Sequence, residues 1–168
     1  LKDLVRNNGG KIVTVDGPRR ISDNIFSLGQ TRAVTKHGVL YEQALAVKTR
    51  RGLSVITGCA HPGITQIVEQ AVKLFGRTPG TVLRKRTVPS GSSQISRPSG
   101  PTIALVCGGF HMKDQTPEEN LKIIERLLKL GVRKVAPLHC TGPAAMRLFR
   151  KNYRLGCVDL KEGGAVTL

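Results

Sequence analysis

The chain has 168 residues, of which 27 are Lys or Arg and 11 are Asp or Glu, so its formal net charge is +16. This length suits one domain, and a hydrophobic share of 39% is enough for a core, which excludes a wholly disordered chain. No apolar run approaches the roughly 18 residues of a transmembrane helix, and no apolar segment follows Leu1, so we expect neither a membrane span nor a secretory signal.

The excess positive charge is spread along the chain and is not gathered in one basic tract. Aromatic residues make up only 4% and Trp is absent, so the stacking surfaces that RNA and single-strand binders use are scarce. We therefore interpret the charge as a basic surface suited to a small anionic substrate. A nucleic-acid-associated domain that uses the fold only as a scaffold is the alternative.

The first part of the chain alternates short apolar runs with turn signals. These runs predict short strands at Lys11–Val15 and Ile25–Leu28. A strand at Ala44–Val47 and a nearly all-apolar strand at Leu53–Thr57 follow, joined by a hairpin turn. Because the second of these is apolar almost throughout, we expect it to be buried on both faces.

A helix and then a stretch of different composition come next. Apolar residues spaced by three and four predict an amphipathic helix over 64–75. In residues 77–100, Gly, Pro, Ser, Thr and Arg dominate and acidic residues are absent. We interpret 77–100 as a flexible basic insertion in an otherwise single domain that spans 1–168.

After the insertion, strands and helices alternate. We predict a strand at 103–107, a helix capped by Thr116, a strand at 134–138, a further helix, and two short strands near 157–160 and 165–168. This alternation indicates an α/β layer architecture.

Three loops, each between a predicted strand and a predicted helix, repeat one pattern of Gly, Cys and His. They are Gly58-Cys59-Ala60-His61, Cys107-Gly108-Gly109-Phe110-His111 and Leu138-His139-Cys140-Thr141-Gly142. Sites in α/β sheets collect just beyond the carboxyl ends of strands, so three of the four histidines stand where they can converge. Imidazole and thiolate are ligands of zinc and other transition metals, and the pattern therefore predicts a metal site.

The chain holds four cysteines, and we expect free thiols in a reducing, cytoplasmic compartment because no secretory signal is visible. Cys59 lies two residues before His61, so an extended backbone would point both side chains the same way. Cys140 directly follows His139, and an extended chain would point its thiol the opposite way.

The motifs in 52–63, 108–111 and 138–142 resemble, in order, signatures of the metallo-β-lactamase superfamily, in particular the branch of the dihydropterin-ribofuranosylaminobenzene-phosphate synthases. The resemblance implies half of an αββα sandwich with metal at the sheet edge. It implies that His61 and His139 are metal ligands, that Cys59 lies close to where many relatives place a bridging Asp, and that His111 is a catalytic residue. The implied cofactor is a divalent metal, zinc foremost, with iron, manganese and nickel as alternatives.

The chain departs from that family ahead of Cys59. Relatives carry an H-x-H-x-D-H motif there, whereas here only His37, which we expect to be exposed, precedes Cys59. We therefore expect the C-terminal half of a metal-dependent hydrolase or synthase, incomplete by itself, whose sheet is covered by a complementary N-terminal half or by a second copy in a homo-dimer. A non-catalytic half that pairs with a separate N-terminal chain is the remaining alternative.

Overall fold

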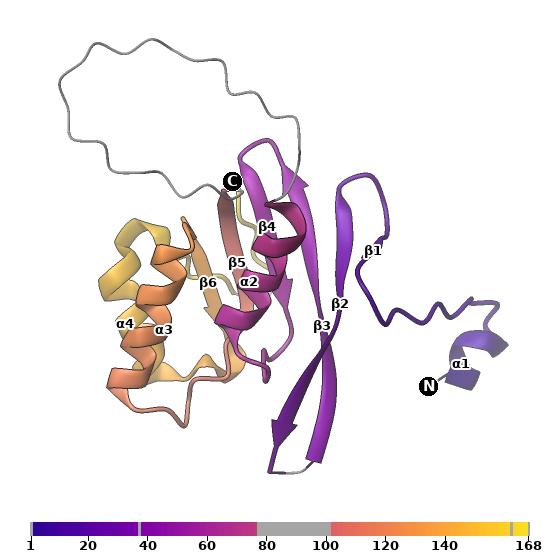
Figure 1. Cartoon of the computed structure of the whole chain (residues 1–168), viewed down its shortest axis with the longest axis horizontal. Helices are drawn as coiled ribbons and strands as arrows, with labels where there is room; N and C mark the ends of the chain where they lie inside the picture. Colours follow the sequence, from indigo (N-terminus) through magenta and orange to yellow (C-terminus); the bar gives the residue numbers. More distant parts are fainter. Residues whose placement is uncertain (1, 37, 77–101, 162, 168) are drawn as a thin grey trace, which may run out of the picture.

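The computed structural model describes residues 2–36, 38–76, 102–161 and 163–167 (Figure 1). They contain one mixed sheet with helices packed on it, whereas the N-terminal helix stands apart from the sheet. The predicted insertion at 77–100 and His37 lie outside the described residues. The six strands follow one another across the sheet in chain order: β1 (Arg19–Arg20), β2 (Ile25–Thr35), β3 (Gly38–Thr49), β4 (Gly52–Thr57), β5 (Ile103–Gly109) and β6 (Val135–Leu138). Neighbours are antiparallel from β1 to β4 and parallel from β4 to β6.

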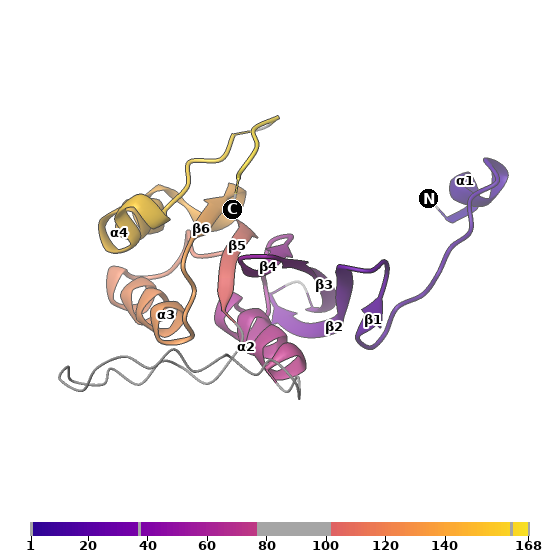
Figure 2. The same cartoon turned by 90° about the horizontal axis from the view of Figure 1, so that it is seen from above.

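The described helices are α1 (Lys2–Asn7), α2 (Ile64–Phe75), α3 (Pro117–Lys129) and α4 (Pro143–Tyr153), with short 3₁₀ turns η1 (His139–Thr141) and η2 (Arg154–Gly156). Helices α2 and α3 lie on the same side of the sheet, and α4 packs beside α3 and β6 (Figure 2). None of these helices has the length and apolar character that a membrane crossing requires. The predicted α/β architecture is confirmed.

The hydrophobic core lies between the helices and the three parallel strands. Val55 of β4, Val106 of β5 and Val135 of β6 are fully buried beneath Ile67 of α2 and Ile124 of α3. Successive strand residues point to opposite faces, and in β5 four residues in a row are buried, so this strand is covered on both faces. This packing fixes where each parallel strand ends, and with it the position of the loops that follow.

Several predicted strands differ from the observed ones. Ile25–Leu28 is only the start of the longer strand β2, which pairs with β3 along most of its length. The strand predicted at Lys11–Val15 is wrong: this segment is largely exposed and joins no ladder. The two C-terminal strands are also wrong within the described residues, because Cys157 forms only an isolated bridge with Val135. The predicted N-terminal and C-terminal segments contain residues that favour strands, but they have no long neighbouring strand with which to form a ladder.

The face of the sheet opposite to the helices is partly open. The predicted burial of β4 on both faces holds for Ser54, which is 4% exposed, but not for Ile56 on the same face, which is 42% exposed. Its cross-strand partner Leu45 is 36% exposed, and Tyr41, further along the same face of β3, is 61% exposed. Leu45 and Ile56 thus form an exposed apolar pair, which the exposed Gln43 separates from Tyr41; Tyr41, Leu45 and Ile56 are here called the β3–β4 strip.

Candidate functional site

The three Gly, Cys and His loops meet at one edge of the sheet. Strands β4, β5 and β6 are parallel, so all three end at this edge. The Gly109 N–H donates to the Gly58 carbonyl at 2.7 Å, which ties the end of β5 to the loop after β4. The Phe110 N–H donates to Thr141 Oγ1 at 3.1 Å, which ties it to η1. Direct hydrogen bonds therefore hold the three loops together.

His61 is fixed by a carboxylate from the neighbouring strand. Glu42 of β3 lies 2.5 Å from the His61 Nδ1 atom through Oε1 and accepts the His61 backbone N–H at 2.9 Å through Oε2. Both side chains are mostly buried, at 25% and 19% exposure. A carboxylate on Nδ1 sets the orientation of the ring and leaves Nε2 as the nitrogen for another partner. Sequence reasoning missed this role of Glu42.

His111 lies against His61, with ring centroids 4.2 Å apart and planes inclined by 46°. Its Nδ1 atom is buried and has no hydrogen-bond partner among the described residues. Burial lowers the pKa of His111 below its ordinary value, and the neighbouring His61 adds to the effect, partly opposed by Asp114. The ring is therefore predominantly neutral at pH 7 and keeps a nitrogen lone pair available.

The remaining predicted ligands lie on the flanking loops. Cys59 is half-buried after β4, and His139 is exposed at the start of η1. Cys140 donates a hydrogen bond to the Cys59 carbonyl at 3.5 Å. The backbone at these positions is not extended, because His139 has a left-handed φ of 44° and opens a 3₁₀ turn. Within the described residues, no three His, Cys, Asp or Glu side chains are grouped closely enough to hold a metal ion.

Backbone strain gathers in the same loops. Four non-glycine residues in the described part of the chain have positive φ, and three of them are Ala60, His111 and His139, at 56°, 49° and 44°. Such conformations are costly for residues with a Cβ and persist where the surrounding structure enforces them, commonly at functional sites. The strain therefore supports a functional role for this edge.

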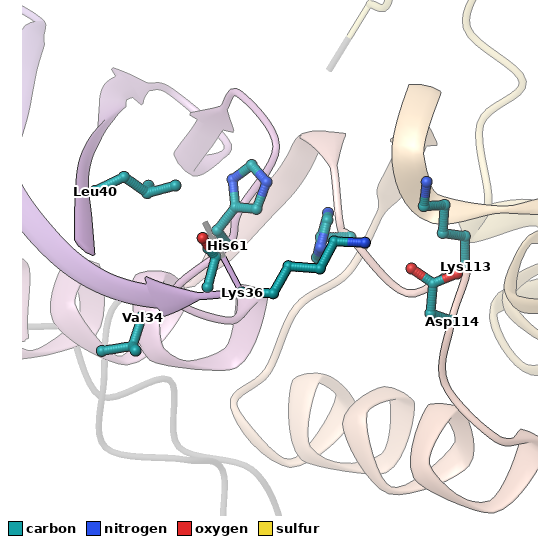
Figure 3. A pocket seen from close by; sticks show the side chains of 8 residues that line it. Val34, Lys36, Leu40, His61, Lys113 and Asp114 are labelled. Atoms are coloured by element: carbon teal, nitrogen blue, oxygen red, sulfur yellow. The ribbon is translucent and has the colours of Figure 1, made fainter. Parts of the chain in front are cut away.

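A cleft of about 610 Å³ opens between these loops and the tip of the β2–β3 hairpin. His61 and His111 line it together with Lys36, Lys113 and Asp114 (Figure 3). Figure 3 shows Lys36 extending from the end of β2 across the view between His61 and Lys113. The cleft therefore combines two imidazoles with two cationic side chains and one carboxylate. His139 and Cys59 are not part of its lining.

Comparison with known proteins gives the following relations. No known family model matches the sequence. The chain is 28% identical over 175 residues to the 7,8-dihydropterin-6-methyl-4-(beta-D-ribofuranosyl)-aminobenzene-5'-phosphate synthase of Methanocaldococcus jannaschii, a match that covers 92% of this chain and 52% of that protein. Among solved structures it is similar to Tm1679, a metal-dependent hydrolase of the beta-lactamase superfamily. The TM-score is 0.70 at 27% identity, over 99% of this chain and 62% of Tm1679.

The chain thus spans about half the length of the curated relative that it matches. Both relations agree with the resemblance that the three loop motifs indicate, one through sequence and one through structure. The resemblance to the metallo-β-lactamase superfamily is therefore confirmed, and the chain has an α/β fold of the metallo-β-lactamase type.

Proposed function

We propose that this chain is part of a metal-dependent hydrolase or synthase that acts on a small anionic substrate of the phosphate or pterin kind. The observation that carries the proposal is the pair of imidazoles, His61 and His111, in a cleft that also presents Lys36 and Lys113. The names of the two similar proteins, a synthase of a phosphate-containing pterin and a metal-dependent hydrolase, support the same function.

The kinds of donor at this edge, imidazole and thiolate, are the usual ligands of a divalent transition metal, but the described side chains are not grouped closely enough to hold one without rearrangement. The Nδ1 atom of His111 is buried beside His61 and has no hydrogen-bond partner in the part of the chain that the structure describes, so a bound ligand or ion would satisfy it. We propose His61, His139 and Cys59 as metal ligands and His111 as the catalytic imidazole that accepts or donates a proton. A metal bound there would supply Lewis-acid polarisation of the substrate and lower the pKa of water.

Zinc is the metal that we propose first. Calorimetry tests whether the chain binds zinc and whether the cleft then binds an anion. Zinc chloride titrated into the metal-free chain should bind, and inorganic phosphate should then bind to the zinc-loaded chain. Lys36→Gln and Lys113→Gln should each weaken phosphate binding several-fold without changing zinc binding, because they remove charge from the cleft. Lys73→Gln, on α2 and away from this cleft, is the matched control. Phosphate binding that is insensitive to both cleft lysines would contradict the proposal.

The β3–β4 strip leads us to propose that a second polypeptide covers this face, either a complementary half or another copy of the chain. Exposed apolar patches on a sheet are normally covered by a packed layer. The similar proteins are longer by an amount that suits such a layer, since this chain covers 62% of Tm1679. We also propose a cytoplasmic location, which the free thiols of Cys59, Cys107, Cys140 and Cys157 support.

Sedimentation of the chain alone tests whether the strip is an interface. Without its other half, the chain should self-associate, and the association should increase with protein concentration. Ile56→Lys should disperse the associated form. Leu128→Lys, which places a charge at a similarly exposed leucine of α3, should leave the association unchanged. A monomer at all concentrations with no apolar-dye binding would contradict the idea of a covered face.

A further inference from the structure

Two cysteines from distant parts of the chain meet at the edge of the sheet where β4, β5 and β6 end. Cys59 follows β4 and Cys140 lies in η1, so 81 positions separate them in the sequence. The Cys140 thiol lies 3.5 Å from the Cys59 carbonyl oxygen. Burial raises the pKa of the Cys59 thiol, and the neighbouring Cys140 side chain adds to the effect. Both residues are half-buried and unpaired by disulfides.

Gly109 provides the space in which these two residues approach each other. A Cβ at this position would stand 2.7 Å from Cys140 Sγ and 3.3 Å from Cys59 Cα. The absence of a side chain here lets the loop after β4 and η1 close over the end of β5. The Gly109 N–H, which donates to the Gly58 carbonyl, holds the first of these loops in place.

We propose that Cys59 and Cys140 are a redox-active pair which a hydroperoxide converts to an intramolecular disulfide. One thiol, as its thiolate, attacks a peroxide oxygen; the O–O bond breaks, a sulfenic acid forms and, with hydrogen peroxide, water leaves. The second thiol then attacks the sulfenic sulfur, forming the S–S bond and releasing a second water molecule. The two thiols are oxidised by two electrons and the peroxide is reduced by two.

The disulfide joins the loop that carries His61 to the turn that carries His139. A disulfide needs sulfurs about 2.05 Å apart, so the Cys140 thiol, which lies 3.5 Å from the Cys59 carbonyl oxygen, must turn toward the Cys59 thiol to form it. While the disulfide exists, neither sulfur is available as a metal ligand. The proposal does not depend on the proposed function, because the pair and its oxidant require no metal.

Peptide mapping of the metal-free, reduced chain tests the proposal directly. Trypsin places the four cysteines on separate peptides, with Cys59 in 52–73 and Cys140 in 135–147. After treatment with equimolar hydrogen peroxide, the non-reducing digest should contain 52–73 linked to 135–147 as the dominant cross-link, and a dithiol reductant should separate them. This measurement on the unaltered chain needs no variant to fold.

Variants then assign the bond. Cys59→Ser and Cys140→Ser should each abolish the cross-link, whereas Cys107→Ser in β5 and Cys157→Ser after η2 should leave its yield unchanged. Cross-links distributed equally among all four cysteines would overturn the proposal. Separate sulfinic acids on Cys59 and Cys140 without a cross-link would overturn it as well.

Discussion

The Glu42 carboxylate contacts His61 at two points, the ring Nδ1 at 2.5 Å and the backbone N–H at 2.9 Å. One carboxylate thereby sets both the ring orientation and the position of the loop that carries it. Carboxylates placed behind a ligating histidine in this way usually increase its basicity and hold its tautomer.

Glu42→Gln should therefore weaken zinc binding by about 10–100-fold, because the tautomer of His61 is no longer fixed by a carboxylate. Calorimetric titration of the metal-free variant with zinc measures the change. Glu69→Gln, which removes an exposed partner of Arg126, is the control and should bind zinc as the unaltered chain does. Equal zinc affinity in the two variants would show that Glu42 plays no part in positioning.

Thr116→Ala should cost about 1 kcal/mol in the free energy of unfolding, measured by urea titration. Thr116 accepts the Glu119 N–H, and the Glu119 carboxylate accepts the Thr116 N–H in return, a capping box at the start of α3. The hydrogen bond from the Thr116 backbone, followed by that from its side chain, lowers the pKa of Glu119.

A lowered carboxylate pKa contributes stability above the unfolded-state value near 4.5, and that stability is lost as the pH falls through the folded-state value. Glu119→Gln should therefore flatten the pH dependence of unfolding below about pH 4.5. Glu118→Gln, its neighbour in the same first turn, is the control. An unchanged acid profile in the Glu119 variant would contradict the role of the capping box.

Gly108→Ala should destabilise the fold by about 2–4 kcal/mol. Gly108 has a φ of 134°, and a Cβ there would overlap the Thr57 carbonyl oxygen of the neighbouring strand. Gly58→Ala is a matched control from the same edge, because a Cβ at Gly58 meets nothing within 4 Å. Equal urea midpoints for the two variants would mean that β4 and β5 can separate without cost.

Oxidation of the Cys59–Cys140 pair should raise the free energy of unfolding. Closing a loop of 81 positions corresponds to about 4.5 kcal/mol in the chain-entropy model, less any strain in the folded state. For a chain of this size the midpoint of thermal unfolding should rise on the order of 10 °C. Calorimetry on the oxidised and reduced forms measures it, and an oxidised form that melts lower would show that the bond strains the two loops.

The sequence predicts the parallel half of the fold well because its signals are local. Helix α2 follows from apolar spacing, and α3 from Thr116 at its start. The long β2–β3 hairpin is harder to foresee, since polar residues such as Gln30 and Arg32 interrupt its apolar pattern. The residues of β2 and β3 pair with each other across the hairpin, and no local sequence pattern reveals this pairing.

The sequence also predicts part of the site, because some of its signals are local. Its three loops follow strand ends and can be read from Gly, Cys and His in order. The pairing of Glu42 with His61 depends on the register between β3 and β4, in which Ala44 lies opposite Thr57. Cys140 approaches Cys59 from a 3₁₀ turn that His139 opens with a left-handed backbone. Neither relation is encoded in the spacing of the residues concerned.

The metal content of four proteins tests the central claim most directly. The unaltered chain, His61→Ala, His139→Ala and His37→Ala are each incubated with zinc, desalted and measured by elemental analysis, with folding checked by circular dichroism. Zinc should remain on the unaltered chain and on the His37 variant, and fall to background in the other two. Equal zinc in all four proteins would contradict a metal centre at the ends of β4 and β6.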